Sequence, residues 1–116
     1  MATSIGAFDT QSDPLLLLVA AALTARVRPD VQVVDVGQSA TFVCVVSGSP
    51  SPSVAWYKDG APLNEDVEDS ERVTLSADRR QLSVSGVLRQ DAGIYQCLVE
   101  NSHDSQQSAG RLIIGG

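Results

Sequence analysis

The sequence predicts an all-β fold, a sandwich of two sheets, and two observations carry this prediction. Cys44 and Cys97 each lie within a short run rich in β-branched and aromatic residues, which is the composition of strands. Two cysteines on separate strands, far apart in the chain, suit a bridge between facing sheets, with Trp56 on the next strand packing on the sulfur atoms. At 116 residues the chain has room for one core of ordinary size, and therefore for one domain.

The surroundings of the second cysteine follow a recognisable pattern. Residues 91–97 read Asp-Ala-Gly-Ile-Tyr-Gln-Cys, and Tyr95, two positions before Cys97, fits a tyrosine corner. The order and spacing of these residues resemble the intermediate set of the immunoglobulin superfamily over about residues 26–114. The resemblance implies a two-sheet immunoglobulin-like sandwich with one inter-sheet disulfide. The residues that carry it are Cys44, Trp56, Leu82, Asp91, Gly93, Tyr95 and Cys97.

Alternation predicts which way the strand residues face. In residues 39–47 the inward Cys44 places Phe42 and Val46 inward, because successive side chains point to opposite faces. Residues 24–29 read as the first strand with Val27 inward, and Pro29 breaks it. The strand resumes over residues 31–36, where a run of valines leaves the register ambiguous. A short strand is expected near residues 61–63, a further strand over 81–87 with Leu82 inward, a last hairpin loop over 101–107 and a closing strand over 108–114.

The first 23 residues are expected to lie outside the domain, which then spans residues 24–116. Their apolar run, residues 15–23, is far shorter than the roughly 20 residues that cross a bilayer. Nothing before it is basic, and Asp9 and Asp13 are acidic, which is wrong for the leading region of a signal peptide. A leader, an added tag and the remnant of a preceding domain all remain open.

Composition and residue types exclude several classes of function. The net charge of −6, with no cluster of basic residues beyond Arg79-Arg80, argues against a nucleic-acid partner. Catalysis is not expected, because the sole histidine, His103, lies in a loop and both cysteines belong to the core. Residues 64–71 carry five acids, but their spacing matches no calcium loop. No metal, cofactor or small-molecule substrate is therefore predicted.

Within the immunoglobulin family an arginine at the position of Arg72 pairs with the aspartate before the tyrosine corner. The resemblance therefore implies a structural ion pair between Arg72 and Asp91.

A closer resemblance concerns function. Residues 25–29, 33–37, 56–60 and 90–97, with a Ser/Gln-rich final hairpin, are similar to the alternatively spliced seventh immunoglobulin domain of arthropod Dscam cell adhesion molecules, and equally to the first domain of the shortened Dscam proteins. This resemblance implies an extracellular, membrane-tethered multidomain protein, with this domain binding its own copy as an antiparallel homodimer. The contact would use the sheet of the first, second, fourth and fifth strands. Its expected outward residues are Arg26, Arg28, Thr41, Val43, Val45, Thr74, Gln81, Ser83 and Ser85.

Two alternatives remain open at this stage. The domain could be a structural spacer of a muscle or cytoskeletal protein, with Cys44 and Cys97 reduced, since the number of cysteines alone fits a reducing compartment equally well. It could also belong to a receptor ectodomain that binds a different protein through the acidic run at residues 64–71.

Overall fold

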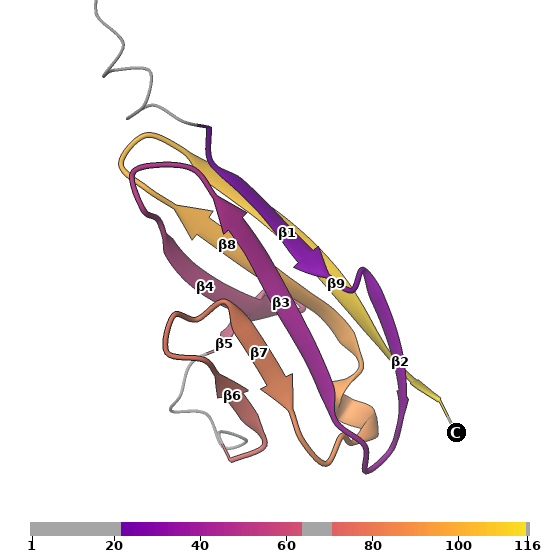
Figure 1. The fold of residues 1–116 in the computed structure, drawn as a ribbon. Helices are drawn as coiled ribbons and strands as arrows, with labels where there is room; N and C mark the ends of the chain where they lie inside the picture. Colours follow the sequence, from indigo (N-terminus) through magenta and orange to yellow (C-terminus); the bar gives the residue numbers. More distant parts are fainter. Residues whose placement is uncertain (1–21, 64–70, 116) are drawn as a thin grey trace, which may run out of the picture.

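The computed structural model describes residues 22–63 and 71–115, which form two sheets packed face to face (Figure 1). The strands are β1 Thr24–Arg28, β2 Val31–Asp35, β3 Ala40–Ser47, β4 Ser53–Lys58, β5 Ala61–Leu63, β6 Val73–Leu75, β7 Gln81–Val84, β8 Gly93–Glu100 and β9 Ser105–Gly115, with a short 3-10 helix η1 at Arg89–Asp91. One sheet has the order β1-β3-β7-β6 and the other the order β2-β9-β8-β4-β5. The predicted two-sheet sandwich is confirmed.

The first strand of the chain is divided between the two sheets. β1 pairs antiparallel with β3, and after Pro29 the chain crosses over so that β2 pairs parallel with β9. The crossing leaves Thr41 of β3 beyond the end of β1. The side-chain amide of Gln32 fills this place, because its Nε2 donates to the Thr41 carbonyl at 3.0 Å and its Oε1 accepts from the Thr41 N–H at 3.4 Å.

The core lies between the sheets and is centred on the predicted residues. The Cys44–Cys97 disulfide joins β3 to β8, and Trp56 stands beside Cys97 in the strand register and is 1% exposed. Leu82 and Tyr95 are equally buried, and the Tyr95 ring stacks on Phe42 with centroids 5.4 Å apart. These large side chains fill the space closely, so that a Cβ on Gly110 would lie 2.7 Å from the Phe42 ring.

The final hairpin differs from the sequence prediction. The loop is confined to residues 101–104, because Ser105 pairs with Glu100 and Gln107 with Leu98. Placing residues 105–107 in the loop was therefore wrong. Their polar side chains suggested a loop, but an exposed position on a hairpin accepts polar side chains while the backbone pairs regularly. His103 lies in the shortened loop and is exposed.

The domain boundary needs a small correction at Leu23. This leucine was expected to lie outside the fold, but it is 3% exposed and belongs to the hydrophobic core. A Cβ atom added to Gly48 would lie 2.6 Å from the Cα of Leu23, which is too close for a real contact. Glycine is therefore required at position 48, where the chain passes Leu23. Residues 1–21, which hold the rest of the apolar run, lie outside the described residues. Within the part of the chain that the structure describes, no helix is long and apolar enough to cross a membrane.

Candidate recognition surface

The outer face of the β1-β3-β7-β6 sheet carries the nine residues expected on the contact surface. The strand register links them directly, because Arg26 is paired with Val45 and Arg28 with Val43 on the neighbouring strands. Towards the other edge, Val43 is paired with Gln81, and Ser83 is paired with both Thr41 and Thr74. Ser85 follows β7, and its backbone N–H donates to the Arg72 carbonyl at 2.8 Å. The structure thus brings these residues together on one surface, which we call the four-stranded face.

The centre of the four-stranded face is apolar and uncharged. Val43 and Val45 are 38% and 48% exposed, which is high for valines on a strand of a small domain. Beside them the small side chains of Thr41 and Ser83 meet, with their hydroxyl oxygens 3.4 Å apart. The four strands contain no acidic residue. The strands at the centre of this face therefore present a partner with small or apolar side chains and no charge of their own.

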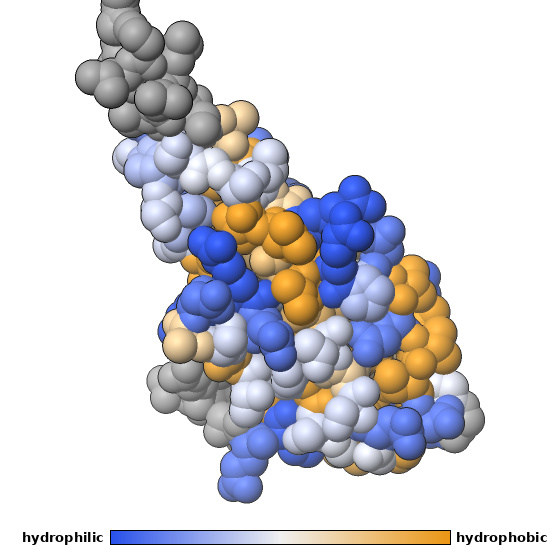
Figure 2. Space-filling model, in the orientation of Figure 1, coloured by the Kyte–Doolittle hydropathy of each residue, from blue (hydrophilic) through white to orange (hydrophobic). Residues whose placement is uncertain are grey.

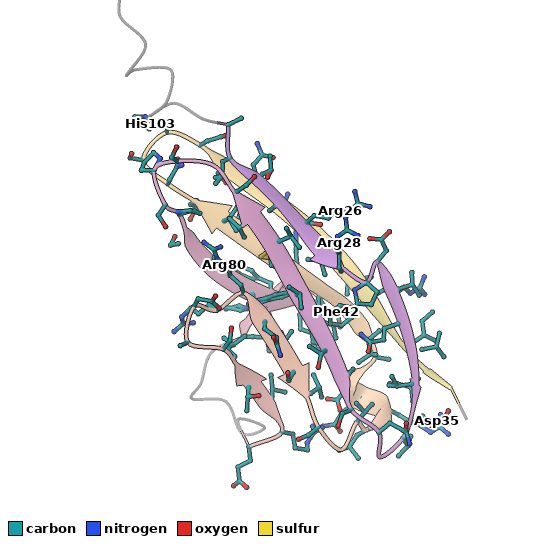
Figure 3. The ribbon with its side chains drawn as sticks, viewed as in Figure 1. Arg26, Arg28, Asp35, Phe42, Arg80 and His103 are labelled. Carbon is teal, nitrogen blue, oxygen red and sulfur yellow. A yellow bond between two sulfur atoms is a disulfide. The ribbon has the colours of Figure 1, made fainter. Side chains whose placement is uncertain are left out.

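Arginines border this apolar centre on both sides. Figure 2 shows hydrophobic surface between strongly hydrophilic regions, and Figure 3 places Arg26 and Arg28 on one side of β3 and Arg80 on the other. In residues 22–63 and 71–115, none of these three guanidinium groups takes part in an ion pair or a side-chain hydrogen bond. Guanidinium groups bind carboxylates through two parallel hydrogen bonds, so Arg26 and Arg28 are available for an acidic partner, whereas the charge of Arg80 already interacts with the carboxylate of Asp78.

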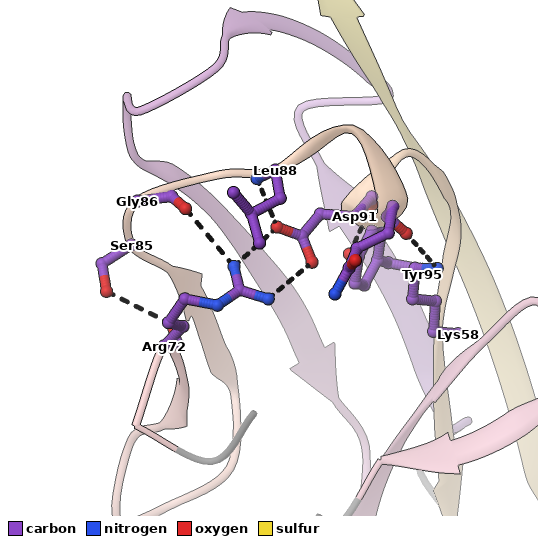
Figure 4. A network of polar contacts seen from close by, with 8 residues as sticks. Lys58, Arg72, Ser85, Gly86, Leu88, Asp91 and Tyr95 are labelled. Atoms are coloured by element: carbon purple, nitrogen blue, oxygen red, sulfur yellow. Dashed lines mark hydrogen bonds and ion pairs between the residues drawn. The ribbon is translucent and has the colours of Figure 1, made fainter. Parts of the chain in front are cut away.

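The Arg72 and Asp91 side chains meet beside Ser85 and Gly86, where the chain leaves β7 (Figure 4). Arg72 Nη1 lies 2.7 Å from Asp91 Oδ2, and the Leu88 N–H donates to the same oxygen at 2.7 Å. The Tyr95 hydroxyl donates to the Asp91 carbonyl at 2.6 Å, which completes the tyrosine corner. Burial by itself raises the pKa of Asp91, but the Arg72 hydrogen bond and charge and the Leu88 hydrogen bond outweigh it, so the net pKa is lowered. The geometry gives this pair a structural role.

Other candidates from the sequence offer no reactive site. Within the described residues no group of three His, Cys, Asp or Glu side chains is placed to hold a metal ion. The acidic run lies almost entirely outside the described residues, and only its last member, Glu71, is placed, as an exposed residue.

Sequence reasoning missed Arg80 as part of this surface. Arg80 follows the turn between β6 and β7, where alternation gives no guide to direction. Its backbone carbonyl accepts from the Cys44 N–H at 2.7 Å, which fixes it beside β3. No signal in the sequence identifies this contact, because it depends on how far β7 extends along β3.

Comparison with known proteins places the chain in one family. A family model described as the immunoglobulin I-set domain matches residues 24–114. The chain is 35% identical to cell adhesion molecule Dscam1 of Drosophila melanogaster over 106 residues, which are 91% of this chain and 5% of that protein. It is 36% identical to neural cell adhesion molecule 1 of Rattus norvegicus over 78 residues, 67% of this chain and 9% of that protein. The chain thus spans a small part of the curated relatives that it matches.

Solved structures agree with the sequence comparisons. The N-terminal eight immunoglobulin domains of the Down syndrome cell adhesion molecule, isoform 1.30.30, superpose with a TM-score of 0.69 at 32% identity, covering 84% of this chain and 13% of that one. The N-terminal four immunoglobulin domains of Dscam1 isoform 1.9 superpose with a TM-score of 0.68 at 31% identity, covering 83% of this chain and 22% of that one.

Proposed function

Because this chain belongs to the immunoglobulin I-set family, we propose that it binds a second copy of itself through the four-stranded face. It is an adhesion and recognition module and not an enzyme. One observation carries the proposal. The four-stranded face combines exposed valines with arginines that have no acidic partner among the described residues, on strands without any acidic residue. Such a surface is complementary to one that supplies carboxylates.

The names of the related proteins support a function in adhesion. Dscam1 and neural cell adhesion molecule 1 are cell adhesion molecules by name, and one of the similar solved structures is described as the structural basis for Dscam isoform specificity. We propose that the parent protein is a multidomain molecule held at the cell surface, with this domain outside the cell, where the Cys44–Cys97 disulfide is stable.

A two-fold contact would explain the composition of the face. In such a dimer each surface meets its own copy in reverse, so a basic region on one copy needs an acidic region elsewhere on the other. Arg26 and Arg28 at the β1 edge would meet acids near the start of β6, such as Glu71, or Asp69 in the part that the structure does not describe. One sheet face buries little area, so we expect weak association by the single domain, strengthened by neighbouring domains of the parent protein.

Sedimentation equilibrium over a wide concentration range tests the proposal. The comparison is between the intact chain and one that lacks residues 1–22, which keeps the buried Leu23. We expect a dimer in both, and an antiparallel contact predicts that Arg26→Glu combined with Arg28→Glu weakens it. Arg111→Glu is the matched control, because Arg111 is an exposed strand arginine on the other sheet.

The outcomes separate the proposal from its rivals. Loss of the dimer on removing residues 1–22 would assign the association to that segment and would overturn the proposal. Equal weakening by Arg111→Glu and by the pair on β1 would show that the effect is not specific to the four-stranded face.

A further inference from the structure

A second apolar surface lies on the outer face of the other sheet. β2 alternates, with its even-numbered residues turned toward the interior and its odd-numbered residues outward. Val33 is 63% exposed, the largest fraction among the large apolar side chains of the described residues. Its partner in the register with β9 is Ile113, which is exposed as well. Figure 2 shows hydrophobic surface at the right of the view, on the side where Figure 1 draws β2.

This surface carries one positive and one negative charge. Asp35 is the only charged residue of β2, and Arg111 is the only charged residue of β9. Both are exposed, and among the described residues neither side chain takes part in an ion pair or a hydrogen bond. Arg111 is in register with Val31, so about 13 Å of strand separates it from Asp35. Within one chain the two charges are therefore too far apart to pair.

The strand register arranges these residues in a way that suits a second copy. Three rows run across the two strands, which we call the β2-β9 surface, and they pair Val31 with Arg111, Val33 with Ile113, and Asp35 with Gly115. The apolar row thus lies between a row with a cation and a row with an anion. A two-fold axis that crosses the strands at the central row lays the cation row of each copy on the anion row of the other. The same axis lays the apolar row on its own copy.

The third row has room for an incoming arginine. A Cβ atom added to Gly115 would lie 3.4 Å from Asp35 Oδ1 and 3.4 Å from Val33 Cγ1, so these two side chains flank the glycine. In the antiparallel arrangement Arg111 of the second copy arrives over Gly115. Its guanidinium group then has the Asp35 carboxylate directly beside it.

We propose that the β2-β9 surface binds a second copy of the chain in antiparallel orientation, with Arg111 of each copy paired to Asp35 of the other. Apolar surface of Val33 and Ile113 is buried at the centre, while charge-assisted hydrogen bonds form on both sides of it. The contact lies on the opposite sheet from the four-stranded face, so a chain that uses both faces associates beyond the dimer. It covers two strands instead of four, so it should form at higher protein concentration than the contact through the four-stranded face. Arg111→Glu should therefore leave that first dimer in place.

Disulfide trapping on the full chain tests the position of the axis. Val33 lies at the axis, so the thiols of Val33→Cys on two copies should come within bonding distance and form a covalent dimer under mild oxidation. Val31→Cys is the matched control, because Val31 is also exposed on β2 but would lie about 13 Å from its own copy. The native disulfide is buried and does not compete. Non-reducing gel electrophoresis should show roughly tenfold faster cross-linking of Val33→Cys, and equal rates would overturn the contact.

A charge swap tests the ion pairs. A chain with Arg26→Glu and Arg28→Glu has a weakened four-stranded contact, so its remaining self-association reports on the β2-β9 surface. In that background Arg111→Glu opposes two carboxylates at both contacts, and the Kd should rise roughly tenfold or more. Adding Asp35→Arg to Arg111→Glu restores opposite charges and should recover the original Kd. Adding Glu100→Lys to Arg111→Glu is the matched control, because it returns the same net charge at an exposed position at the far end of β8.

Sedimentation equilibrium measures each variant, and circular dichroism checks that each keeps its strands. Recovery of the Kd by Asp35→Arg and not by Glu100→Lys would support the contact. A background chain that stays monomeric at every concentration, or a loss that Asp35→Arg does not reverse, would overturn the β2-β9 contact and leave the four-stranded face untouched. A wild-type dimer that is insensitive to Arg26→Glu with Arg28→Glu but is weakened by Arg111→Glu would support the β2-β9 surface and overturn the proposal for the four-stranded face.

Discussion

At the residue scale the most constrained group is the carboxylate of Asp91. The residue is 5% exposed, and its carboxylate accepts from Arg72 and from the Leu88 N–H while its carbonyl accepts from Tyr95. A buried charge is tolerated only when it is paired and hydrogen-bonded, so removing one partner leaves the others unsatisfied. The side chain of Arg72 is 22% exposed and remains partly hydrated, so leaving Arg72 unpaired costs less free energy than leaving the buried Asp91 unpaired.

Asp91→Asn should destabilise the fold and reduce its sensitivity to acid. Because the folded-state pKa of Asp91 lies below its ordinary value of 3.8, the stabilisation is present above that value and is lost as the pH falls through the lower folded value. We expect a loss of about 2–4 kcal/mol in the free energy of unfolding at neutral pH. The difference between variant and wild type should shrink below about pH 3.8.

Urea unfolding at pH 7, 5 and 3 measures both effects. Asp30→Asn, at an exposed aspartate between β1 and β2, is the control and should leave the unfolding curve at each pH close to wild type. A constant difference between Asp91→Asn and wild type across this range would contradict a role for the carboxylate charge.

At the element scale, alternation predicted the directions of strand residues but not the partners of the strands. Cys44 fixed the register of β3, so Thr41, Val43 and Val45 were placed outward correctly. The valine run of β2 has no such anchor, and its parallel pairing with β9 depends on residues far along the chain. Arg80 was missed for the same reason. Local pattern specifies which face a side chain occupies, whereas the position at which a strand ends against its neighbour is a tertiary property.

The one polar side chain between the valines of β2 has a structural task that a sequence pattern does not show. Gln32→Ala should leave the N–H and the carbonyl of Thr41 without their side-chain partner at a part-buried position. We expect a loss of about 1–3 kcal/mol in the free energy of unfolding. Thermal or urea unfolding measures it.

The neighbour Val33 supplies the control for this test. Its side chain is 63% exposed on the same strand, so Val33→Ala should change the free energy of unfolding by no more than about 0.5 kcal/mol. Equal effects of the two substitutions would show that strand propensity, and not the Gln32 amide, accounts for the loss.

At the scale of the whole molecule, the disulfide links the two sheets across 53 residues of chain. Closing a loop of this length restricts the unfolded chain, and the loss on replacing both cysteines by alanine should be about 4 kcal/mol. Chemical unfolding of the double variant beside wild type measures it. Because Cys44 and Cys97 are 1% and 0% exposed, the thiols must be titrated in the unfolded chain, which should contain no free thiol if the domain matures outside the cell. Two reactive thiols per unfolded chain, without added reductant, would instead support the reading as an intracellular spacer.

The parallel pairing of β2 with β9 also determines how the domain would respond to mechanical load. β1 begins at one end of the sandwich and β9 finishes at the other, as Figure 1 shows. Force applied at Thr24 and Gly115 would therefore pull β2 and β9 past each other along their length, and their five registered positions would be loaded together instead of being opened one by one. A bond array loaded in shear yields at higher force than one that is unzipped. A module built in this way can transmit tension along its length while its two sheets stay packed together.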